Sequence, residues 1–195
     1  MIKQTNYQRL YEIAENQSGY FRSNQALSAG YSRPNLYFQT ERGRFIRISK
    51  GIYRLSFFPS SPFDDFFVAI LESGPRSVVS HASALAVYEL SDILPGEIHI
   101  TISRNRSRRR AGIKYHTCKI SKNEITSYKG LPITTVERTI TDAIRNGLDP
   151  HLVKQAIHQG IDRGMLTRTS LLDQARHSDK RTLTMIHSIL SEDHA

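Results

Sequence analysis

The feature that most constrains the fold is a change of hydrophobic period at residues 43–55, GRFIRISKGIYRL. Side chains alternate between two faces from Phe45 to Lys50, as they do on a strand, and Gly51 follows at the position of a tight turn. A second short apolar run, from Ile52 to Leu55, then returns along the first. The pattern predicts a β-hairpin.

Three short helices are expected before this hairpin. Apolar residues recur at helical spacing in the first, which ends near Gly19, and the second ends near Gly30. The third begins after Ser32, a good N-cap residue, and ends near Gly43. Three helices followed by a two-stranded hairpin within 58 residues describe a winged helix-turn-helix.

In such a unit the third helix enters the major groove of DNA and reads base edges with its first turns. Arginine pairs well with guanine, and asparagine or glutamine pairs well with adenine. The candidate base-reading residues are therefore Ser32, Arg33, Asn35 and Gln39. The alternative is an ordinary solvated helix face.

The hairpin, or wing, of this fold lies against phosphates. The phosphate candidates are Arg42, Arg44, Arg47 and Lys50, with Arg22 and Gln25 as secondary candidates. Four such contacts give a log–log dependence of affinity on salt with a slope of about −3.6, at roughly 0.9 per phosphate. We expect the apolar half of the hairpin to pack on the helices while its cations, Arg54 among them, face the DNA. The alternative is a wing whose charge only aids solubility.

Composition agrees with an intracellular protein that binds a polyanion. The formal net charge is +9, and residues 1–58 carry nine lysines and arginines against three glutamates. The single cysteine, Cys118, excludes an internal disulfide and a zinc site built from cysteines. The N-terminus lacks the apolar core of a signal peptide, and no apolar run approaches the ~18 residues of a membrane span. We therefore expect a cytoplasmic protein without membrane contact.

A second basic cluster occurs in the sequence RNRSRRR at residues 104–110. Its five arginines are Arg104, Arg106, Arg108, Arg109 and Arg110. Strand patterns flank it on both sides, so it is expected to be a loop between strands. It could contact nucleic acid, present a surface to an acidic partner, or form a solvated hairpin tip.

The proline-containing segment FFPSSPFDD separates two predicted domains, a winged helix-turn-helix at 1–58 and a second domain at 63–195. Alternating patterns near 98–103, 112–120 and 125–135 indicate strands of a small sheet. Thr134 and Glu137 fit a capping box at the start of a helix that ends at Gly147, and Asp149 with Pro150 begins the next. The fold class is therefore α+β, with a small mixed domain and C-terminal helices following the winged helix.

Residues that would suggest an enzyme have simpler explanations. Ser80, His81 and Ser83 are neighbours at a helix start, where a serine and a histidine are not expected to face each other, and Ser80 is expected to cap the helix. His151 and His158 lie two helical turns apart, too far to share an ion directly. We expect a protein without catalytic residues, metal or cofactor.

Several segments together resemble a known family. They are GYFRSNQALSAGYSRPNLYFQTERGRFIRISKGIYRL, VVSHASALAVYEL, IHITISR and LPITTVERTITDA, in that order. With them the chain resembles, over about residues 10–175, the AbiEi antitoxins of bacterial type IV toxin–antitoxin (abortive infection) systems. The resemblance implies a repressor that binds inverted repeats in its own operon, as a dimer or cooperative pair. It also implies a C-terminal domain that opposes a nucleotidyltransferase-like toxin, with or without touching it.

Two hypotheses therefore stand. In the first the chain is a DNA-binding repressor and antitoxin that acts through the winged helix. In the second it is a partner- or RNA-binding antitoxin in which the loop at 104–110 carries the main interaction and DNA binding is secondary. The relative importance of the two basic clusters distinguishes these hypotheses.

Overall fold

The computed structural model describes residues 5–103 and 110–192, which divide into two compact units. One unit comprises Met1–Pro75 with Lys129–Leu131, and the other comprises Arg76–Tyr128 with Pro132–Ala195. This division differs from the expected boundary at 58–63, because helix α4 (Asp64–Ser73) packs against strands of the first unit. Within the described parts of the chain, no helix is long and apolar enough to cross a membrane.

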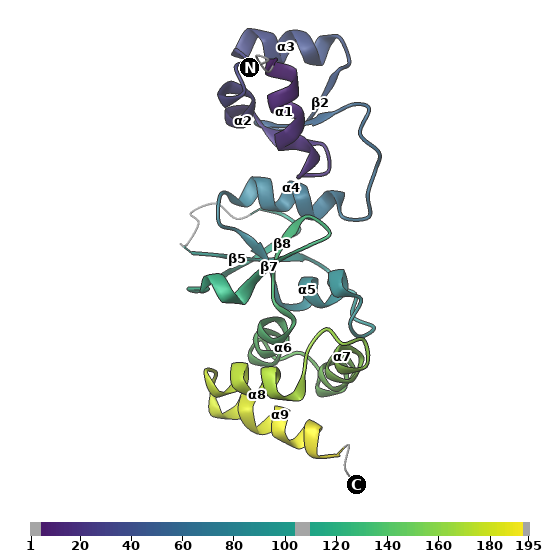
Figure 1. Ribbon diagram of the computed structural model, residues 1–195, viewed down its shortest axis with the longest axis vertical. Coiled ribbons are helices and arrows are strands. Elements are labelled where there is room, and N and C mark those ends of the chain that lie inside the picture. The colour runs from purple at the N-terminus through teal and green to yellow at the C-terminus, as the bar shows by residue number, and fades with distance from the viewer. Residues whose placement is uncertain (1–4, 104–109, 193–195) are drawn as a thin grey trace. The chain divides into compact units, whose positions relative to one another are not determined.

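The first unit combines helices with a small antiparallel sheet (Figure 1). Its elements before α4 are α1 (Asn6–Glu15), β1 (Tyr20–Arg22), α2 (Ser23–Ser28), α3 (Arg33–Glu41), β2 (Phe45–Ser49) and β3 (Ile52–Leu55). The three helices and the hairpin agree with the sequence-based expectation. The sheet, however, has three strands in the order β1-β3-β2, because the short β1 pairs with β3.

The core of this unit lies between helices α1 to α3 and one face of the sheet. Phe21 at its centre is fully buried, with its ring 5.1 Å from that of Phe45 and 5.8 Å from that of Tyr53. The expectation that the whole apolar half of the hairpin is buried is wrong. Ile46 and Ile48 are 43% and 40% exposed on the edge strand β2. Ile46 follows the buried Phe45 and so lies on the other face, and Ile48 lies where the pairing with β3 shifts register.

Helix α4 packs on β1 and β3 at the other face of the sheet. Arg54 is held there, because its guanidinium lies 3.5 Å from the carboxylate of Asp64 and 5.1 Å from the centre of the Tyr20 ring. It also donates a hydrogen bond of 2.7 Å to the carbonyl of Pro59. The expectation that Arg54 faces DNA with the other wing cations is therefore wrong.

The second unit contains a mixed five-stranded sheet in the order β6-β5-β4-β8-β7. Its strands are β4 (Val78–Val79), β5 (Ile98–Ile102), β6 (Ile113–Thr117), β7 (Ile125–Tyr128) and β8 (Leu131–Thr134). Strand β4 pairs antiparallel with β5 and parallel with β8. Strands β5 and β6 pair in parallel.

The helices of this unit pack around α6 (Val136–Arg145), which confirms the α+β class. The other helices are α5 (His81–Tyr88), α7 (Pro150–Asp162), α8 (Arg168–Arg176) and α9 (Lys180–Glu192), and a 3-10 turn lies at Lys122–Glu124.

The helix caps of this unit were predicted in part. Asp149 caps α7 as expected. The cap of α6 is Thr135, which accepts from the backbone N–H of Arg138, whereas Thr134 is the last residue of β8 and bonds to the hydroxyl of Thr139. The predicted capping box at Thr134 is therefore wrong by one residue.

Candidate nucleic-acid interface

Helix α3 is fixed at its start and along one face. The hydroxyl of Ser32 accepts a hydrogen bond of 3.2 Å from the backbone N–H of Asn35, so Ser32 is the N-cap, as the sequence predicted. Leu36 is buried and joins the helix to the core. All other positions of this nine-residue helix are at least partly accessible.

The four candidate base-reading residues do not lie on a single face of α3. At about 100° per residue, Asn35 and Gln39 share one flank of the helix, and Arg33 lies on the opposite flank. The side chains of Arg33 and Asn35 are exposed. Gln39 is half-buried and accepts a long hydrogen bond of 3.5 Å from Arg44. Ser32 is exposed but already engaged as the cap.

Two aromatic residues of α3 complete its outer surface, and neither was predicted as a site residue. Tyr37 and Phe38 are 63% and 56% exposed, with their rings 6.2 Å apart. The sequence contained a signal for this exposure, because Tyr37 and Phe38 follow the buried Leu36 by one and two positions. They therefore lie about 100° and 200° around the helix from the buried face. Aromatic rings at such positions are available to a binding partner.

The four primary phosphate candidates form an accessible run from the end of α3 to the hairpin turn. Arg42 is the C-cap of α3, Arg44 precedes β2, Arg47 lies within β2, and Lys50 lies at the turn beside Gly51. All four cations are exposed, and none has an ion-pair partner among the residues that the structure describes. They are therefore free to neutralise phosphates.

The two secondary phosphate candidates are engaged inside the first unit. Arg22 donates through Nη2 to the carbonyl of Leu71 in α4. The carboxamide of Gln25 accepts a 2.7 Å hydrogen bond from the backbone of Arg22 and donates to Gln17 at 3.2 Å. These contacts cap α2 and hold α4, so we remove Arg22 and Gln25 from the proposed interface.

The second basic cluster is described only at its end. Arg104, Arg106, Arg108 and Arg109 lie outside the described residues. Arg110 is exposed and forms an isolated antiparallel bridge with Ile113 at the start of β6.

The serines and histidine at the start of α5 are arranged differently from the expectation. His81 has a left-handed backbone (φ 53°), and its Nδ1 lies 2.9 Å from Oγ of Ser80, so these neighbours do face each other. Ser80 makes no side-chain cap bond but accepts from Thr101 at 2.7 Å. Ser83 instead accepts from the backbone N–H of His99 at 2.8 Å. Because Ser80 is fully buried, this pair is not presented to a substrate.

Three histidines from separate elements meet in the second unit. The rings of His81 and His116 stack with centroids 3.6 Å apart, and Nε2 of His116 lies 3.2 Å from Nδ1 of His99. Burial is the main cause that lowers the pKa of His81 to about 2 and that of His116 to about 4, and it lowers the pKa of His99 as well. Although these three side chains lie close together, no group of three or more histidine, cysteine, aspartate or glutamate side chains in the described ranges 5–103 and 110–192 is arranged so that it could hold a metal ion.

Comparisons with known proteins agree with the helices and hairpin of the first unit. Residues 8–56 match the family model described as "Transcriptional regulator, AbiEi antitoxin". This match confirms the resemblance to AbiEi antitoxins over the segment from α1 to the end of the hairpin, and it identifies that segment as similar to transcriptional regulators.

A solved structure shares the fold. The chain is similar to the crystal structure of the RV2827C protein from Mycobacterium tuberculosis, with a TM-score of 0.51 and 13% sequence identity. The similarity covers 95% of this chain and 76% of the other, and at this identity it concerns the fold alone. No curated protein matches the chain.

Proposed function

We propose that this protein is a DNA-binding antitoxin that represses its own toxin–antitoxin operon in the cytoplasm. Its winged helix-turn-helix, residues 1–58, binds the operator, and the C-terminal domain counteracts a nucleotidyltransferase-like toxin. The observation that carries the DNA-binding step is the run of four exposed, unpaired wing cations beside α3, within the segment that matches a regulator family.

The charges and positions of the residues in this interface support two separate roles, contact with phosphates and reading of bases. Arg42, Arg44, Arg47 and Lys50 lie between the end of α3 and the hairpin turn, where a wing meets the DNA backbone. Asn35 offers an amide that can pair with adenine, and it is free of internal side-chain hydrogen bonds within the described residues. Cations thus position the protein while α3 reads a short half-site.

Repression follows from occupancy. Two protomers on an inverted repeat cover the promoter and exclude polymerase, and they bind as a dimer or as a cooperative pair on the DNA. The operator symmetry then mirrors the two-fold relation of the protomers.

The test is binding of the purified full chain to the DNA upstream of its own gene and to a scrambled duplex. Fluorescence anisotropy is measured from about 50 to about 200 mM salt, a range over which phosphate contacts strongly affect affinity. We expect tight, sequence-dependent binding with a slope near −3.6, from roughly 0.9 per phosphate over four contacts. Equal affinity for both duplexes would overturn specific operator recognition by α3.

The second hypothesis, a partner- or RNA-binding antitoxin, makes the opposite prediction for two double variants. On our proposal Arg44→Ala with Arg47→Ala abolishes operator binding, and Arg108→Ala with Arg109→Ala changes it little. If the second pair instead abolishes rescue from the toxin while the first pair has no effect on rescue, the five-arginine segment at 104–110 carries the main interaction.

A further inference from the structure

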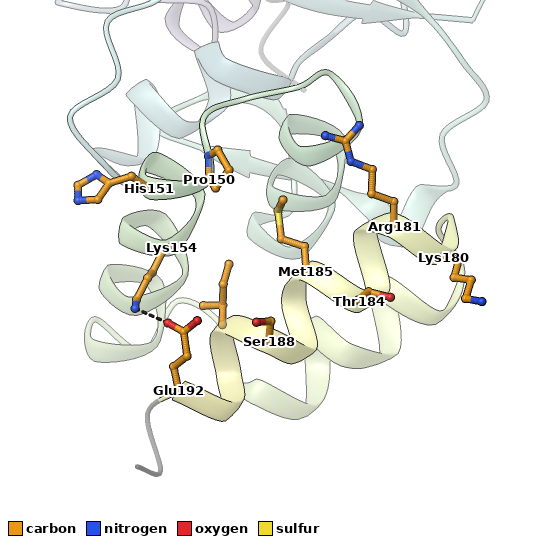
Figure 2. A pocket seen from close by; sticks show the side chains of 10 residues that line it. Pro150, His151, Lys154, Lys180, Arg181, Thr184, Met185, Ser188 and Glu192 are labelled. Carbon is orange, nitrogen blue, oxygen red and sulfur yellow. Dashed lines mark hydrogen bonds and ion pairs between the residues drawn. The ribbon is translucent and has the colours of Figure 1, made fainter.

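A groove of about 790 Å³ lies between α7 and α9 of the second unit (Figure 2). Helices α7 and α9 both pack against α6, and most of the residues that line the groove are exposed. Its volume falls within the roughly 300–1,000 Å³ of typical ligand pockets. The functions proposed above use none of the residues that line it.

The floor of the groove is apolar. Ile189 is buried and lines the groove. Met185 is half-buried and points into the space between the two helices, and Pro150 lies on the α7 side. Thr184 and Ser188 are small and exposed, so they leave room above this floor. An apolar side chain that entered the groove would be removed from water against Met185 and Ile189.

The rim of the groove is positively charged at one end. At the other end Lys154 pairs with Glu192 at 2.5 Å, which neutralises that part of the rim. Lys180 and Arg181 are exposed, and neither has a carboxylate partner in the described part of the chain. Their aliphatic stems extend the apolar wall while their charged ends remain available to an anion.

We propose that this groove binds an amphipathic helix of a partner protein, with an apolar stripe that enters the groove and acidic residues beside it that pair with Lys180 and Arg181. Helix α9 has 13 residues and is therefore about 20 Å long, enough to align with roughly three to four turns of a bound helix. Helix-in-groove recognition uses anchors at i, i+3 or i+4, and i+7.

The charge and the polarity of the groove favour an acidic amphipathic helix over nucleic acid and over a second copy of this chain. Nucleic acid would satisfy the two cations, but its backbone would leave the apolar floor unfilled. A second copy of this chain carries the same net charge of +9, so its approach is opposed at this cationic rim. An acidic amphipathic helix would place apolar side chains against the floor and carboxylates beside the cations of the rim. The proposal does not depend on DNA binding by the first unit.

The experiment uses the full chain and a fluorescein-labelled model peptide about four helical turns long, with leucines at i, i+3, i+4 and i+7 and glutamates on one flank. Two matched peptides replace the glutamates by lysines or the leucines by serines. Fluorescence anisotropy gives the affinities. We expect the acidic peptide to bind at least about tenfold more tightly than either matched peptide, because each of these lacks one of the two kinds of contact.

Protein variants locate the binding. Met185→Asp should weaken binding about tenfold or more, and Lys180→Glu with Arg181→Glu should reverse the preference towards the lysine peptide. The same charge change at two exposed lysines elsewhere in the second unit, Lys119→Glu with Lys122→Glu, should alter affinity less than about twofold. Circular dichroism verifies folding, and the charge reversal suffices as the test if Met185→Asp unfolds the unit.

Four outcomes would overturn the proposal. The first is failure of the acidic peptide to bind, and the second is equal binding of all three peptides. The third is self-association of the chain, seen by sedimentation and lost in Met185→Asp, which would make a second copy the occupant. The fourth is DNA binding that is weakened in the Lys180→Glu with Arg181→Glu variant while the acidic peptide does not bind, which would assign the groove to nucleic acid.

Discussion

The ring of His81 lies parallel to the ring of His116, with centroids 3.6 Å apart and planes inclined by 14°. Such close stacking suits two neutral imidazoles, whereas two imidazolium ions at this distance would repel each other. His99 is within hydrogen-bonding distance of His116, so a proton added to any ring disturbs all three. The cluster therefore couples the stability of the second unit to pH.

The first prediction is that the free energy of unfolding falls as the pH is lowered from about 6.5, the ordinary histidine pKa, to about 4, the pKa of His116. In that window the unfolded chain binds protons that the folded chain does not, so acid favours unfolding. Above about 6.5 both states are neutral, and the stabilising effect is complete. Urea titrations followed by circular dichroism at a series of pH values measure the fall.

His116→Phe isolates the contribution of the cluster, because phenylalanine keeps a stacking ring but has no titratable nitrogen. The free energy of unfolding of this variant should fall less steeply as the pH is lowered than that of the wild type. The difference in slope should be up to about 1.4 kcal/mol per pH unit, the value for one proton. His187→Phe, on the exposed side of α9, controls for the substitution itself. Equal slopes for the wild type and His116→Phe would contradict the prediction.

The second prediction concerns Arg138, which joins α6 to the preceding 3-10 turn. Its Nε donates to Asp142 at 2.8 Å, and its Nη1 donates to Glu124 at 2.6 Å. The side chain of Asp142 is only 4% exposed, so Arg138→Met leaves a buried carboxylate whose remaining cation is the half-exposed Arg145, 4.0 Å away. We expect a loss of about 3–5 kcal/mol in the free energy of unfolding, measured by urea titration.

The double variant Arg138→Met with Asp142→Leu should regain much of this loss, because the more deeply buried carboxylate is then removed. Glu124 also loses Arg138 in this variant, but it keeps hydrogen bonds from the backbone of Ser121 and from Gln174. Arg176→Met breaks an exposed pair with Asp173, whose side chains are 69% and 55% accessible, and should cost less than about 1 kcal/mol. A single Arg138→Met variant as stable as Arg176→Met would show that water already screens the pair.

Local signals predicted much of the fold because their cause lies within a few residues. Ser32 at the start of α3 and Asp149 before Pro150 were predicted as N-caps, and both accept the expected backbone hydrogen bond. Thr135 rather than Thr134 caps α6, although only Thr134 has a glutamate three residues later, because strand β8 extends to Thr134. Strand β1 has three residues, too few to show a period.

Long-range contacts account for what the sequence could not predict. Ile46 and Ile48 have the pattern of buried residues, but β2 is an edge strand and α4 packs on β1 and β3 instead. Arg54 carries the charge expected of a wing contact, yet Asp64 holds it inside the unit. The histidine cluster joins α5, β5 and β6, and no spacing along the chain encodes that meeting.

The third prediction concerns the wing. Arg47→Ala with Lys50→Ala removes two exposed cations, so the slope of log affinity against log salt should become smaller in magnitude by about 1.8, at roughly 0.9 per phosphate. Binding should weaken by a similar factor on operator and scrambled DNA, since phosphates carry no sequence information. Lys119→Ala with Lys122→Ala makes the same charge change in the second unit. An equal slope change in that control would assign the effect to net charge alone.

The fourth prediction concerns base reading by α3. Asn35→Ala should weaken binding to the operator by about 1–3 kcal/mol, as expected for loss of a bidentate contact with adenine. Because Asn35 carries no charge and contacts the cap of α3 only through its backbone, the salt slope and the thermal stability should stay unchanged. Anisotropy titrations on operator and scrambled duplexes separate this effect from that of the wing. A loss of equal size on both duplexes would show that Asn35 contacts the DNA backbone, and base reading would then pass to the opposite flank of α3, at Arg33 and Tyr37.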